Sequence, residues 1–186
     1  MAETLVTEFI SVDPEGLAAL SAKGKADPTV VRTVKCRTVA EGRRFRHLNY
    51  IRDLPAHIVD EPKALLGDDT APNPTEALLA ALGTCLSVGI QANAVARGWK
   101  INGITLDLEG DINITSVWGA GDLSPKPVGL TAVRIAVDVD VEGASEEQIA
   151  ELVEHSAKWS PVVNTVKNPV AMEITPRRLD DDPRTR

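Results

Sequence analysis

The pattern of apolar and polar positions predicts strands on both sides of a long apolar segment. Residues 101–114, INGITLDLEGDINI, and residues 130–143, LTAVRIAVDVDVEG, alternate apolar and polar side chains. This period of two predicts strands with one buried face. Three shorter strands are expected at residues 29–37, 46–52 and 56–62, where β-branched and aromatic residues gather between turns.

The apolar segment itself predicts a buried central helix. No charged side chain occurs between Glu76 and Arg97, and a helix that is apolar on nearly all sides is buried by a sheet or a partner subunit. Asn73 is suited to cap the helix, Pro74 to its first position and Glu76 to a capping box, and Gly98 is expected to end it. The polar residues and glycines inside the segment argue against a membrane span.

The remaining segments complete an α+β pattern. Residues 144–159, ASEEQIAELVEHSAKW, predict an amphipathic helix capped by Ser145. Residues 170–176, VAMEITP, predict a last strand, and a short helix is expected from Pro14 to about Lys23. The predicted order is β(3)-α-β(2)-α-β, in which antiparallel hairpins supply most of the sheet.

We therefore expect three regions along the chain. Residues 1–28 form an N-terminal extension, residues 29–176 form the domain, and residues 177–186 form a charged C-terminal tail. A chain of 186 residues is long enough to bury one core of ordinary size, either alone or in a dimer.

Charge and cysteine content narrow the function classes. A formal net charge of −7 argues against binding to a nucleic acid or to an anionic membrane surface, because both require a clustered positive face. The acidic start MAETLVTEFI lacks the features of a signal peptide, so we expect a cytoplasmic protein. Two cysteines do not suggest a disulfide framework, and a reducing compartment keeps them as thiols.

Two segments carry a resemblance to a known family. Residues 60–85, DEPKALLGDDTAPNPTEALLAALGTC, and residues 160–166, SPVVNTV, resemble the OsmC/Ohr family of thiol peroxidases and their relatives. The resemblance implies an intertwined homodimer with buried central helices and with active sites at the subunit interface. It also implies that Cys85 is the thiol that attacks the O–O bond of an organic hydroperoxide.

The partners of that thiol differ from the family pattern. The family uses an arginine from the early strand region, for which Arg43, Arg44 and Arg46 are the candidates. The family's glutamate corresponds to Thr75, and Glu76 follows one position later, where it is either catalytic or only a helix cap. Its resolving cysteine corresponds to Ser160, whose hydroxyl cannot form a disulfide.

Other side chains extend the list of candidates. Cys36 shares a predicted strand face with Val34, so we expect it to be buried, although it is also an alternative resolving thiol. Trp118 and Trp159 either line an apolar pocket together with Thr75 and Ser160 or pack in the core.

Three functions follow from these candidates. The first is a hydroperoxide reductase that depends on an external thiol. The second is an inactive relative that binds a small apolar or electrophilic ligand at the dimer interface. A hydrolase with Cys85 and His155 is the third. His47, His57 and His155 lack metal-ligand spacing, and no phosphate-binding glycine loop occurs, so we expect no metal and no cofactor.

Overall fold

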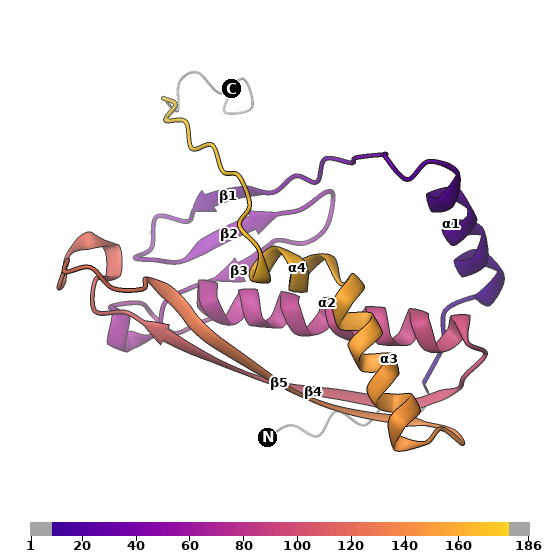
Figure 1. Ribbon diagram of the computed structural model, residues 1–186. Helices are drawn as coiled ribbons and strands as arrows, with labels where there is room; N and C mark the ends of the chain where they lie inside the picture. The colour runs from indigo at the N-terminus through magenta and orange to yellow at the C-terminus, as the bar shows by residue number, and fades with distance from the viewer. Residues whose placement is uncertain (1–8, 179–186) are drawn as a thin grey trace.

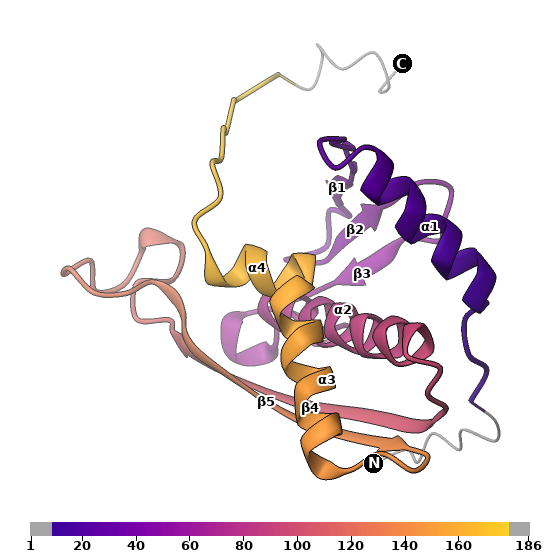
Figure 2. The ribbon, with the colours of Figure 1, turned by 45° about the vertical axis from the view of Figure 1, so that its right-hand side comes forward.

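Helix α2 (Pro74–Ala96) lies between two antiparallel sheets (Figures 1 and 2). The computed structural model describes residues 9–178. The first sheet has the order β1-β2-β3, and the second is the hairpin of β4 and β5. The strands are β1 (Arg37–Ala40), β2 (His47–Tyr50), β3 (His57–Val59), β4 (Ile101–Asn113) and β5 (Gly129–Val141). The predicted α+β class is confirmed.

The ends of α2 agree with the sequence prediction. The Glu76 N–H donates to Asn73 Oδ1 at 2.9 Å, and the Glu76 carboxylate accepts from the Asn73 N–H at 2.7 Å, which completes the capping box. Gly98 follows the helix with a φ of +71°, the left-handed conformation that glycine adopts most readily at this position.

The core lies where α2 meets the β4–β5 hairpin and helix α3 (Glu146–Trp159). Its buried residues are Leu86, Ile90, Ala94, Ile101, Val141 and Leu152. A Cβ atom on Gly83 would lie 2.7 Å from the Leu108 side chain, so this glycine allows α2 to approach β4 closely. By length and composition α2 is apolar enough to span a membrane, but it packs against β4 and α3 as the core helix of this fold.

Helix α3 is followed directly by a short helix that the sequence pattern did not predict. Ser145 caps α3, as predicted, and it also forms a second capping box with Gln148. Helix α4 (Pro161–Lys167) then begins directly after Ser160, which is its N-cap, and α4 packs against α2 and α3. Two single-turn helices, η1 (Lys63–Leu65) and η2 (Val117–Gly119), lie in loops.

Within the described residues, the first of the expected strands is displaced to Arg37–Ala40, and the last expected strand is absent. Only Arg37 of the segment 29–37 belongs to β1, and residues 170–176 form no strand. Both segments expose apolar side chains, such as Val34 at 93% and Ile174 at 90% exposed. A strand requires a hydrogen-bonding neighbour, and the described chain pairs neither segment with one.

The predicted N-terminal helix is confirmed as α1 (Pro14–Ala26), which begins at the cap Asp13. It packs against α2 and lies near the C-terminal half of that helix (Figures 1 and 2). The division into an extension, a domain and a tail stays a prediction, and the predicted tail lies outside the described residues from residue 179 onward.

Candidate functional site

The Cys85 thiol is half-buried on α2 and contacts the hydroxyl of Ser160. Ser160 Oγ donates a hydrogen bond to Cys85 Sγ at 3.2 Å, across 75 positions of sequence. Ser160 is only 2% exposed, and it is held at the junction of α3 and α4. The fold therefore brings Cys85, which ends the segment 60–85, into contact with Ser160, which begins the segment 160–166.

Glu76 lies in the capping box at the start of α2, nine positions before Cys85. At about 100° per residue this separation places the two side chains on opposite faces of the helix. The capping function of Glu76 is confirmed by its hydrogen bond to the Asn73 N–H. Thr75 is a half-buried residue of the first turn, ten positions before Cys85.

The three candidate arginines are paired with residues of their own turn and of the loop that precedes α2. Arg43 Nε and Arg44 Nη1 both donate to the Asp68 carboxylate, at 2.8 Å and 2.6 Å. Arg46 Nε donates to Glu41 at 2.6 Å. Each of these guanidinium groups is thus bound outside the immediate contacts of Cys85.

Asp60, which the sequence pattern did not predict as a site residue, lies at the centre of this region. Its side chain is fully buried after β3. The carboxylate accepts from the Glu61 N–H at 2.8 Å and from the Thr70 hydroxyl at 2.7 Å. Thr70 Oγ1 in turn accepts from Arg46 Nη1 at 2.7 Å. Asp60 therefore ties β3 and the arginine turn to the loop that leads into α2.

The hydrogen bonds of Asp60 outweigh its burial. Burial alone raises the pKa of a carboxyl group, but donors from Thr70 and Glu61 lower the pKa of Asp60 from 3.8 to about 2. The neighbouring Glu61 has a raised pKa, first through burial and then through the negative charges of Asp60 and Glu76. Asp60 is therefore a charged structural anchor at neutral pH.

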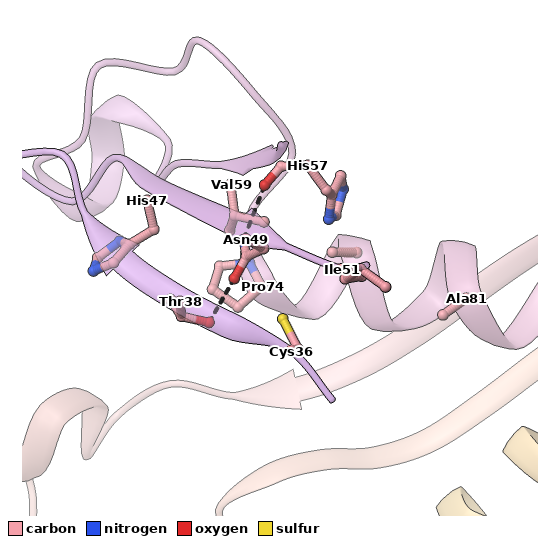
Figure 3. A pocket seen from close by; sticks show the side chains of 10 residues that line it. Cys36, Thr38, His47, Asn49, Ile51, His57, Val59, Pro74 and Ala81 are labelled. Atoms are coloured by element: carbon pink, nitrogen blue, oxygen red, sulfur yellow. Dashed lines mark hydrogen bonds between the residues drawn. The ribbon is translucent and has the colours of Figure 1, made fainter. Parts of the chain in front are cut away.

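An apolar hollow of about 540 Å³ lies between the three-stranded sheet and the first half of α2 (Figure 3). The residues that line it are Cys36, Thr38, His47, Asn49, Ile51, His57, Val59, Pro74, Ala77 and Ala81. Several of the polar groups are used within the wall, because Thr38 donates to Asn49 at 2.7 Å and Asn49 donates to the carbonyl of His57 at 3.1 Å. The volume is within the range of small-molecule sites.

The prediction that Cys36 is buried is wrong. Cys36 is exposed, because residues 29–36 form no paired strand that would cover it, and its sulfur stands at the hollow (Figure 3). Cys85 is not among the residues that line the hollow. However, Ala77, Ala81 and Cys85 are spaced by four positions, so they form one stripe along α2. Cys85 lies one helical turn beyond the floor of the hollow.

The two tryptophans lie in different places. Trp118 is in η2 at the end of the hairpin, where its ring lies 5.0 Å from that of Phe45. Trp159 ends α3 immediately before Ser160, and it is 66% exposed. Their participation in one pocket stays a prediction.

The three histidines lie in two different parts of the structure. His155 is an exposed residue of α3, and His47 and His57 line the hollow. Within residues 9–178, no group of three or more His, Cys, Asp or Glu side chains is arranged to hold a metal ion. Within the described residues, the hydrogen-bond partner of the Cys85 sulfur is the Ser160 hydroxyl.

Comparison with known proteins links this arrangement to one family. The model of the family described as OsmC-like protein matches residues 67–175, which include both Cys85 and Ser160. No curated protein matches the sequence significantly.

Solved structures share the fold at low sequence identity. An OsmC-like protein from Mycoplasma pneumoniae is 19% identical, with a TM-score of 0.60, and the match covers 74% of this chain and 89% of that one. An OsmC-like protein of unknown function from Vibrio cholerae is 15% identical, with a TM-score of 0.61 and coverage of 78% and 100%. The organic hydroperoxide resistance protein OsmC from Legionella pneumophila is 16% identical, with a TM-score of 0.54 and coverage of 75% and 92%.

Proposed function

Because the chain belongs to the OsmC-like protein family, we propose that it is a thiol-dependent organic hydroperoxide reductase in which Cys85 is the reactive thiol. The observation that carries the proposal is the contact between Cys85 Sγ, on the apolar helix α2, and Ser160 Oγ, at the start of α4. The name of the Legionella pneumophila protein, an organic hydroperoxide resistance protein, supports the substrate class.

The proposed reaction requires two co-substrates. The Cys85 thiolate attacks the terminal oxygen of a hydroperoxide ROOH, an S–O bond forms, and the O–O bond breaks. The alkoxide leaves and takes up a proton to become an alcohol, while Cys85 becomes a sulfenic acid. An external thiol then attacks the sulfur, releases water and forms a mixed disulfide. A second thiol displaces the Cys85 thiol and leaves as the oxidised disulfide.

An external thiol is required because a serine, Ser160, opens the segment SPVVNTV. Ser160 occupies the position from which a cysteine would reach Cys85, and a hydroxyl cannot form a disulfide. Cys36 is the alternative internal thiol, and it stands at the hollow. A reducing compartment contains small thiols that would regenerate Cys85.

We further propose that the protein acts as a homodimer. Apolar side chains of α2 such as Leu78 and Val88 are exposed, and so are apolar residues of the unpaired segments 29–36 and 170–176. A second copy of the chain would cover these side chains. Dimeric mass in light scattering at micromolar concentration supports this proposal, and a monomer contradicts it.

Peroxide consumption tests the reaction directly. Purified protein with dithiothreitol is expected to consume cumene hydroperoxide, and a Cys85→Ser variant is expected to lose this activity. A Cys36→Ser variant separates the two thiols, because it stays active if the external thiol reduces Cys85. Equal rates for the wild type and the Cys85→Ser variant refute the reductase.

A second candidate function is supported by the hollow. An inactive relative would bind a small apolar ligand there, because Ile51, Val59 and Ala77 line the walls. Binding of cumyl alcohol, measured by calorimetry, without peroxide turnover would support this second function. A bulky Ala77→Trp substitution should then abolish the binding heat. Cysteine hydrolase chemistry has no such support, since the hydrogen-bond partner of Cys85 within residues 9–178 is a serine and not a histidine.

A further inference from the structure

The Ser160 hydroxyl has its single proton directed at the Cys85 sulfur. As the N-cap of α4, Ser160 Oγ accepts from the Val163 N–H at 3.4 Å. This contact uses a lone pair of the oxygen and leaves the hydroxyl proton free to donate. The acceptor is Cys85 Sγ at 3.2 Å. The same atom therefore starts a helix and hydrogen-bonds a thiol.

The backbone around Ser160 is fixed by a neighbour from the same motif. The Ser160 carbonyl accepts from the Asn164 N–H at 3.0 Å and from Asn164 Nδ2 at 2.9 Å. Asn164 Nδ2 also donates to the Lys158 carbonyl at 2.9 Å, across the end of α3. These hydrogen bonds of the segment SPVVN fix the backbone at the junction of α3 and α4. The Ser160 side chain therefore starts from a fixed backbone position.

A donor at this position acts differently on the two forms of the cysteine. A neutral thiol is a weak acceptor, whereas a hydrogen bond to an ionised acceptor is roughly twice as strong. The contact therefore gains strength when Cys85 loses its proton. The guanidinium groups of Arg43, Arg44 and Arg46 are bound by Asp68, Glu41 and Thr70, so within residues 9–178 they do not make this contact.

We propose that Ser160 is a positioning residue that holds the Cys85 sulfur and stabilises its thiolate through the hydroxyl hydrogen bond. This inference rests on the proposed function in one respect, namely that Cys85 is a reactive thiol. It assigns to Ser160 a contribution to reactivity, and not only the loss of a disulfide partner.

The reactivity of the thiol tests this proposal without any peroxide. The chain has two cysteines, so in a Cys36→Ser background Cys85 is the only thiol. The rate of its alkylation by iodoacetamide at neutral pH is followed by intact mass spectrometry. Ser160→Ala is expected to slow alkylation about tenfold, because a hydrogen bond to a charged group is lost. Ser160→Thr keeps a hydroxyl and is expected to restore most of the rate.

Two further variants separate this effect from helix capping and from burial. Ser160→Gly removes the donor but costs the cap of α4 only a little stability, so it should be as slow as Ser160→Ala and is used if the alanine variant does not fold. Ser156→Ala is the matched control. Ser156 is equally buried on α3, but it donates to the Leu152 carbonyl and should leave the alkylation rate unchanged.

The outcomes distinguish this inference from the proposed function. Unchanged or faster alkylation in folded Ser160→Ala and Ser160→Gly overturns the positioning role, even where peroxide turnover persists. Slow alkylation in both variants, with recovery in Ser160→Thr, supports it. If the parent protein then fails to consume cumene hydroperoxide, the reductase falls while the positioning of the thiol stands.

Discussion

Replacing Ser160 by cysteine should create a disulfide with Cys85. The atoms Cys85 Sγ and Ser160 Oγ are already 3.2 Å apart. A disulfide bond is about 2.05 Å long, so the two side chains need to approach each other by about 1.1 Å, which small rotations of both side chains supply. In the Cys36→Ser background, these two residues are the only thiols of the variant.

The expected gain in stability follows from the length of the closed loop. The bond links residues 75 positions apart. The chain-entropy estimate for a loop of this length is about 4.5 kcal/mol, before any strain in the folded state. For a chain of this size, such a gain raises the Tm by about 10 °C or more. The increase should disappear when dithiothreitol reduces the bond.

Mass spectrometry and thermal unfolding measure the two effects. One equivalent of cumene hydroperoxide should convert Ser160→Cys to a form that lacks two hydrogen atoms and both free thiols. The matched control is Ser156→Cys. Ser156 is a buried residue of α3 that faces Gly89 on α2, because a Cβ atom added to Gly89 would lie 3.6 Å from Ser156 Cβ. This variant should form no disulfide within the chain.

The refuting result is a folded Ser160→Cys protein that keeps both thiols after oxidation. Equal disulfide formation in Ser156→Cys would also refute the geometry, because the bond would then not depend on the contact with Cys85. Either outcome would show that Cys85 and Ser160 are not in the contact described above.

Three further predictions concern stability and assembly. Since the folded pKa of Asp60 is about 2 and its ordinary value is 3.8, its charge stabilises the fold above pH 3.8 and this contribution is lost as the pH falls towards 2. Asp60→Asn should therefore flatten the acid branch of the thermal stability curve, and an unchanged slope contradicts the anchor. Asn73→Ala should cost about 1 kcal/mol through the lost cap of α2 and lower the Tm by a few degrees, whereas Gln148→Glu keeps the capping box of α3 and serves as control. Ile174→Asp changes a side chain that is 90% exposed in the single chain, so it should dissociate the proposed dimer in light scattering but leave a lone folded chain almost unaffected; an unchanged dimer shows that this segment lies outside the interface.

The elements that the sequence predicted well depend on local interactions. The capping box of Asn73 and Glu76 and the terminal Gly98 fix both ends of α2. The alternation in residues 101–114 and 130–143 identifies β4 and β5, which pair with each other directly through a hairpin. Caps and turns involve residues a few positions apart, so their signals are present in any short window of sequence.

The errors occur where an element depends on a distant neighbour. Residues 29–36 and 170–176 have the composition of strands, but the described chain provides them with no pairing strand. Helix α4 was missed because only seven residues, Pro161–Lys167, form it, and its start depends on the cap at Ser160. Cys36 is exposed for the same reason as its segment.

The sequence by itself determined the family-like motifs, the central helix and the identity of the two thiols. Only the tertiary structure decided which groups meet. It placed the Ser160 hydroxyl on Cys85, bound Arg43 and Arg44 to Asp68, and buried Asp60 beneath the loop before α2. These contacts join residues that are far apart in the chain, and their energies depend on distance and burial, which no pattern along a sequence contains.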